Sequence, residues 1–187
     1  MPMKIVSAVL TAAAILVGLP QVAGAADPKW PPGPYKYVVI EQDLKDALLE
    51  FGRNINVPVK VSDEVKGKLR GDSGSGTAEE FFKRLMASHG LVWYFDGSVL
   101  HVNAASELRT EVIDLGRIVP SDVVSKLQKL GIADPRFPIR TTPGASVVSI
   151  SGPPPYIVLV RQTLAAMARQ QVLPPEDIRV RVFRGST

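Results

Sequence analysis

Residues 77–102 read TAEEFFKRLMASHGLVWYFDGSVLHV and carry the clearest fold signals in the chain. Thr77 and Glu80 form the T-x-x-E pattern of a capping box, which predicts the start of a helix. Gly90 stands where that helix should stop. Residues 91–102 then show two apolar runs separated by Asp96-Gly97, a pair that favours a type I′ hairpin turn. Apolar residues at helical spacing line the predicted helix: Phe81, Phe82, Leu85 and Met86.

The residues before this stretch complete a first module. Tyr35 to Val39 alternates in the period of a strand, and Asp43 is a plausible N-cap for a helix that reaches Ile55. Val57, Val59 and Val61 predict a second strand, and residues 66–70 a short third one. The module is therefore β-α-β-β-α-β-β. In the proline-rich leader before it, Trp30 either packs on this module or stays exposed for a partner.

The residues after this stretch predict a second module with a similar order. Ser121 is the expected cap of a helix that stops at Gly131. The helix starts of the two modules are offset by 121 − 43 = 78 and 156 − 77 = 79 residues, which agree within boundary error. The remaining predicted elements are a strand at 111–115, a hairpin of 136–141 and 146–151, a helix at 156–170 and a last strand at 178–183.

These patterns predict an α+β fold made of two tandem small modules, each with two helices packed on a small mixed sheet. The expected division is a signal peptide at 1–25, a Pro-rich leader at 26–34, a first module at 35–103, a linker at 104–109, a second module at 110–172, and a C-terminal strand and tail at 173–187.

The first residues resemble an export signal. Lys4 precedes an apolar run, and Ala23-Gly24-Ala25 is an A-x-A site, so we expect cleavage after Ala25 or Ala26 and a periplasmic protein. The 187 residues include no Cys, which excludes disulfides, thiol nucleophiles and Cys-ligated metals. Aromatic residues make up 6% and the net charge is +4, which is weak support for nucleic-acid binding.

Candidate catalytic groups are scattered along the chain. Gly71-Asp72-Ser73-Gly74 matches the tetrad around a serine-protease nucleophile, but no His precedes it, and a loop before a capped helix explains it better. His89 and His101 lack clustered carboxylates, so a metal site is not expected. We expect no cofactor and no enzymatic activity, with a hydrolase using Ser73 as an alternative. In Trp93-Tyr94-Phe95, we expect one aromatic ring to be exposed and the others to be buried in the core.

Three stretches resemble the periplasmic N-terminal modules of bacterial secretins, especially those of type III secretion. Residues 37–52 are similar to the opening strand and helix of the first such module, and residues 65–97 to the rest of it. Residues 147–160, VVSISGPPPYIVLV, are similar to the "strand, Gly-Pro-Pro, Tyr, helix" signature of the second. The resemblance implies an N0-like module followed by an N1-like, KH-like module.

The resemblance also implies a function. A full secretin continues into a pore-forming domain, whereas this chain stops at Thr187, as in a split secretin. We expect a periplasmic ring component of an outer-membrane secretin channel. Its expected partners are a separate pore-forming secretin chain, inner-membrane ring proteins and further copies of itself, with no nucleic acid. The alternative is a soluble periplasmic adaptor or signalling module that binds by strand addition. The candidate interface with the pore-forming chain is the last strand: Ile178, Arg179, Val180, Arg181, Val182 and Phe183.

Overall fold

The computed structural model describes residues 27–38, 40–71, 76–142 and 144–170. The predicted signal peptide, Ser73 and the predicted strand at 178–183 lie outside these residues. In chain order the described elements are β1 (Glu41–Asp43), α1 (Leu44–Asn54), β2 (Val59–Val61), β3 (Lys68–Arg70), α2 (Ala78–Ser88), β4 (Leu91–Phe95), β5 (Leu100–Ala104), the 3₁₀ turn η1 (Ala105–Glu107), β6 (Arg109–Asp114), α3 (Pro120–Lys129), β7 (Ile139–Thr141), β8 (Val147–Gly152) and α4 (Pro154–Gln170).

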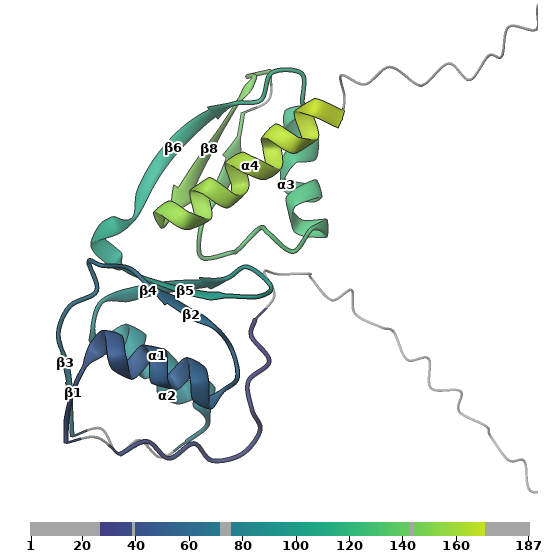
Figure 1. Cartoon of the computed structure of the whole chain (residues 1–187). Coiled ribbons are helices and arrows are strands. Elements are labelled where there is room, and N and C mark those ends of the chain that lie inside the picture. The colour runs from purple at the N-terminus through teal and green to yellow at the C-terminus, as the bar shows by residue number, and fades with distance from the viewer. Residues whose placement is uncertain (1–26, 39, 72–75, 143, 171–187) are drawn as a thin grey trace, which may run out of the picture.

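The first module runs from β1 to β5 and has three layers. Its main sheet has the order β2-β5-β4, with β2 parallel and β4 antiparallel to β5. Helices α1 and α2 lie under this sheet, and a second small sheet of β1 and β3 lies on the other side of α1 (Figure 1). The sequence predicted helices on a small mixed sheet. The structure adds the two-stranded sheet, which brings Leu69 into the same core.

Side-chain caps fix where both helices of the first module begin. The Asp43 carboxylate accepts a hydrogen bond from the Lys45 backbone N–H at 2.9 Å. Thr77 Oγ1 accepts from the Glu80 N–H at 3.2 Å, while Glu80 Oε2 accepts from the Thr77 N–H at 2.9 Å. These bonds satisfy N–H groups that have no partner within a helix. Both caps were predicted from the sequence and are confirmed.

The segment before β1 is held by aromatic packing and is not a strand, so the strand predicted at Tyr35 to Val39 is wrong over its described residues. The Tyr35 and Tyr37 rings stack 6.2 Å apart, and both pack on Phe81. The Tyr37 hydroxyl donates to Gln42 at 2.6 Å, and burial together with the nearby Glu50 carboxylate raises the pKa of Tyr37 to about 12. Ring contacts thus replace ladder hydrogen bonds here.

Trp30 in the leader packs on the first module, which decides between the two expectations for it. Its ring lies 5.5 Å from that of Phe82, 6.2 Å from that of Trp93 and 6.3 Å from that of Phe51. The leader therefore contributes an aromatic side chain to the core beside the two helices.

The turn between β4 and β5 differs from the predicted type I′ turn. Residues 96–99 connect the strands, and among them Gly97 alone has a positive φ, of 97°. A type I′ turn requires positive φ at both central residues. Asp96 Oδ1 instead accepts hydrogen bonds from the N–H groups of Ser98 and Val99, at 2.9 and 2.7 Å, and these bonds shape the longer loop.

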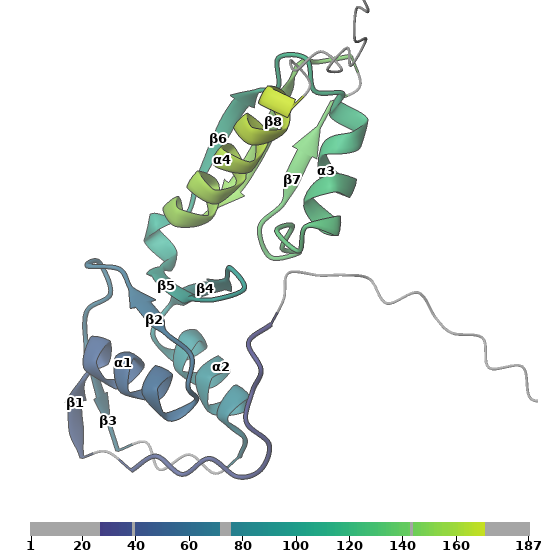
Figure 2. The same ribbon diagram turned by 45° about the vertical axis from the view of Figure 1, so that its right-hand side comes forward.

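The second module has an antiparallel sheet of order β6-β8-β7, with α3 and α4 on one face (Figure 2). Helix α3 begins at Pro120 with Val119 as its N-cap, so the predicted Ser121 cap is wrong. Proline is favoured at the first helical position because its fixed φ suits a helix. Helix α4 begins at Pro154, two residues before the predicted start. Among the described residues, no helix combines the length and apolar character needed to cross a membrane.

The two cap assignments can be compared by experiment. We expect Thr77→Ala to lower the free energy of unfolding by about 1 kcal/mol, because the first turn of α2 loses its capping bond. Ser121→Ala is the matched control and should change stability little, since Ser121 lies inside α3. Urea denaturation followed by circular dichroism measures both. Equal losses would contradict the assignment of the caps.

Candidate assembly interface

Strand β4 contributes side chains to both modules. Trp93 is buried in the core of the first module, together with Leu91. Tyr94, the next residue, points to the opposite face and is 3% exposed in the core of the second module. Successive side chains of a strand point to opposite faces, so this one strand joins two cores. The expected exposed ring in Trp93-Tyr94-Phe95 is therefore not Tyr94.

Arg136 of the second module lies on the ring of Trp93. Its guanidinium carbon is 3.7 Å from the ring centroid, within the range of a cation–π interaction. The same guanidinium binds Asp134 through two hydrogen bonds, Nε to Oδ1 at 2.9 Å and the second nitrogen to Oδ2 at 2.6 Å. The Asp134 side chain is 1% exposed. Burial of a carboxylate requires such a partner, so Arg136 supports the second module while it contacts the first.

Tyr156 completes the junction from the start of α4. Its ring contacts Tyr94 edge-on at 5.6 Å and Phe137 at 5.1 Å. Its hydroxyl oxygen accepts the Asp134 N–H at 3.4 Å, and burial raises the pKa of Tyr156 to about 12. A Cβ atom on Gly152 would lie 2.6 Å from this ring. The glycine and tyrosine of the GPPPY stretch are thus a packing pair.

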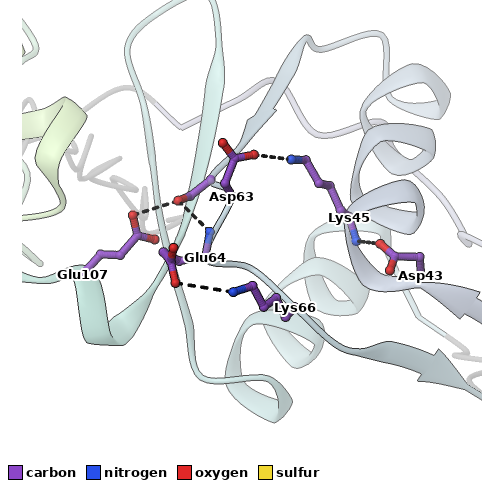
Figure 3. A network of polar contacts seen from close by, with 7 residues as sticks. Asp43, Lys45, Asp63, Glu64, Lys66 and Glu107 are labelled. Atoms are coloured by element: carbon purple, nitrogen blue, oxygen red, sulfur yellow. Dashed lines mark hydrogen bonds and ion pairs between the residues drawn. The ribbon is translucent and has the colours of Figure 1, made fainter.

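Glu107 fastens the linker between the modules to the first module (Figure 3). Its Oε1 accepts hydrogen bonds from Ser62 Oγ at 2.8 Å and from Asn103 Nδ2 at 3.1 Å. Its Oε2 accepts the Ala104 N–H at 2.7 Å. Asn103 is 4% exposed, so loss of Glu107 would leave a buried amide without this acceptor.

A cleft of about 280 Å³ lies beside this linker, between β2, β5 and the start of α4. Lys60 and His101 line it from the first module and Pro154 from the second. At its border, Lys45 donates to Asp63 at 2.7 Å, and this hydrogen bond lowers the pKa of the Asp63 carboxyl (Figure 3). Asp63 is fully exposed, so the pair adds little stability.

The predicted chemical candidates do not gather at one place. His89 is the C-cap of α2, whereas His101 lies in β5, where it pairs with Asp96 at 2.8 Å and stacks on Tyr94. Within the described ranges, no group of three or more His, Cys, Asp or Glu could hold a metal ion. The cleavage residues Ala25 and Ala26 and the candidate interface 178–183 lie outside the described residues.

Sequence reasoning missed Asp134, Arg136 and Glu107. Asp134 and Glu107 belong to no periodic pattern or recognisable motif, and Arg136 was predicted only as the first residue of a strand that in fact begins at Ile139. The uninterrupted apolar run of residues 91–95 was the available signal, because a strand buried on both faces lacks alternation.

Two modules of this order, with the GPPPY helix start in the second, define the N-terminal module pair of a secretin. Among solved structures, one match is InvG N0N1 from the Salmonella SPI-1 injectisome base, with a TM-score of 0.64 and 25% identity. The match covers 76% of this chain and 99% of that one. No family model matches the chain.

Proteins related by sequence show more closely which family the chain belongs to. Nodulation protein NolW of Rhizobium fredii is 39% identical over 180 residues, which are 92% of this chain and 76% of NolW. The type 3 secretion system secretin of Ralstonia nicotianae is 34% identical over 158 residues, and the match spans 84% of this chain but 28% of that secretin. The chain belongs to the NolW family of type III secretion secretin components.

The Arg136 contact can be tested by substitution. We expect Arg136→Ala to lower the free energy of unfolding by about 2 kcal/mol, because buried Asp134 loses its partner. Arg136→Lys should restore only part of this, since an ammonium cannot bind bidentately while stacking on Trp93. Exposed Arg140→Ala is the control and should be near neutral. Urea denaturation monitored by tryptophan fluorescence gives the values, and a neutral Arg136→Ala would refute the assignment.

The Glu107 contacts can be tested by limited proteolysis. Glu107→Ala should speed tryptic cleavage after Arg109 by about tenfold, because the linker loses its bonds to Ser62 and Asn103 and opens more often. Glu64→Ala is a matched control, since Glu64 is exposed and its ion pair with Lys66 spans 3.8 Å. Equal cleavage rates in the two variants would show that Glu107 does not hold the linker.

Proposed function

We propose that this protein is a non-enzymatic, periplasmic ring component of an outer-membrane secretin channel for type III protein secretion. It works with a separate pore-forming secretin chain. The membership in the NolW family carries this proposal, together with the pair of modules joined through β4. The protein's work in this proposal is assembly, which needs surfaces and no catalytic cluster.

The proposal of a separate pore chain follows from the relatives. NolW is 39% identical and is matched over 76% of its own length, whereas the Ralstonia secretin is matched over only 28% of its length. We infer that the modules act in the ring while another chain supplies the pore.

The expected inner-membrane contact is supported by the setting of the solved relative. InvG N0N1 was determined together with SpaPQR and PrgHK in the Salmonella injectisome base. We propose that the corresponding modules of this chain contact inner-membrane ring proteins from the periplasm.

The second module offers two faces for contacts between copies. Helices α3 and α4 cover one side of the sheet, and the other side carries small side chains such as Ser149 and Ser151 of β8, with Val112 of β6 opposite Ser149. A helical face of one copy against the sheet face of the next is a heterologous contact, which closes into a ring when the rotation per copy fits.

Copurification tests this function. A chromosomally tagged chain, solubilised from envelopes of secreting cells, should copurify with the pore-forming secretin, and deletion of its gene should abolish type III secretion. Complementation with Ser73→Ala should restore secretion fully, because no nucleophile is needed.

Three outcomes would contradict the proposal. Absence of the chain from the purified channel would exclude a ring role. Unimpaired secretion after deletion would favour the adaptor alternative. Loss of secretion with Ser73→Ala would favour the hydrolase.

A further inference from the structure

Strand β6 has an open hydrogen-bonding edge. The Leu115 N–H donates to the Ser146 C=O at 2.7 Å. Together with the register of β6 and β8, this bond determines which residues of β6 direct their backbone N–H and C=O groups toward β8. In this phase the backbone groups of Arg109, Glu111 and Ile113 face β8, whereas those of Thr110, Val112 and Asp114 point away from it. Among the described elements, none lies beside this edge (Figures 1 and 2). The Val112 side chain is 67% exposed.

This edge is the longest one left open in the described part of the chain. Strand β6 has six residues, whereas β1, β2, β3 and β7 have three each. The outer edge of β4 belongs to a shorter strand, of five residues. A long, open edge with an exposed valine is a site of strand addition unless something covers it.

The chain contains a segment whose sequence fits this edge. Residues 178–182, IRVRV, alternate apolar and basic side chains and are followed by Phe183. They come after α4 and a connection that includes Pro174-Pro175. From Gln170 to Ile178 an extended chain spans at most about 29 Å. Consecutive prolines in a sequence favour an extended connection, so we expect this one to reach a neighbouring copy.

We propose that residues 178–183 of one copy add as a fourth strand to the β6 edge of a second copy. This inference rests on the proposed ring and names a second contact between neighbouring subunits, beside that of helices against a sheet face. Repeated from copy to copy, the contact is head-to-tail, as a ring requires. It also covers the edge that would otherwise promote aggregation.

The two faces of the added strand match the two faces of β6. On the helix side, Ile178, Val180 and Val182 would extend the apolar layer that contains Ile113. On the opposite side, Arg179, Arg181 and Phe183 would lie beside Val112 and Asp114. Among the described residues, Asp114 pairs with no cationic side chain, so it is available to an arginine. The open edges of β2 and β7 carry Lys60 and Arg140, which would repel this segment, whereas Arg109 of β6 pairs with Glu111 at 3.2 Å.

Disulfide cross-linking tests the proposal, and the absence of Cys from the chain makes the background clean. One full-length mature protein carries Val112→Cys and a second carries Arg181→Cys. After mixing at high concentration and mild oxidation, we expect a covalent heterodimer on non-reducing gels, because facing strand positions come within disulfide reach. Leu130→Cys replaces Val112→Cys as the matched control, since Leu130 is similarly exposed but lies at the end of α3, and its heterodimer should be at least tenfold weaker.

Charge reversal adds a second measurement. Asp114→Arg should reduce the heterodimer several-fold, and the added change Arg179→Asp in the partner should restore it. A heterodimer no stronger than with Leu130→Cys would overturn the proposal. So would a fast-migrating, internally cross-linked monomer from the double variant Val112→Cys/Arg181→Cys without heterodimer in the mixture, because the segment would then bind its own module. Either result with intact copurification of the pore chain would leave the proposed function standing.

Discussion

The structure depends on the burial of both faces of β4. Each module alone has a small core, because surface dominates in domains of this size. Trp93 and Tyr94 are adjacent in sequence, yet one lies in the core of the first module and the other in that of the second. The main sheet of the first module therefore also borders the core of the second module. Separation of the modules would expose Tyr94, Tyr156 and Phe137 to water, which is a strong apolar reason for them to stay together.

A buried charge reinforces this apolar contact. Asp134 is almost fully buried, and a carboxylate in such a place is tolerated only with a partner that satisfies both oxygens. Arginine supplies two parallel N–H donors and a flat face, so Arg136 can bind Asp134 and stack on Trp93 at the same time. The position of Trp93 thereby becomes linked to the stability of the second module. Glu107 acts similarly at the linker, where one carboxylate accepts bonds from β5 and from the end of β2.

The sequence predicted the parts of the fold that depend on neighbouring residues. The Thr77–Glu80 capping box, the Asp43 cap and the order of strands and helices follow from patterns that span a few positions. The Ser121 cap was wrong because Pro120 starts the helix earlier, and the strand at Tyr35 was wrong because its rings pack on Phe81. The junction could not be predicted, since Trp93 and Arg136 meet only once both modules are folded. No periodic pattern within a short stretch of the sequence indicates that contact.

A rigid junction suits the assembly proposed for this chain. A ring of heterologous contacts closes only when each copy is rotated by the same fixed angle relative to the last. Two modules stacked in one chain must satisfy this condition at two levels of the ring at once. With a flexible hinge between the modules, the two levels of the ring could adopt different rotation angles. Fixing the hinge during assembly would then cost conformational entropy in every copy. The Trp93–Arg136–Asp134 contact and the Glu107 bonds remove this freedom before assembly, so contacts between copies need not supply that ordering.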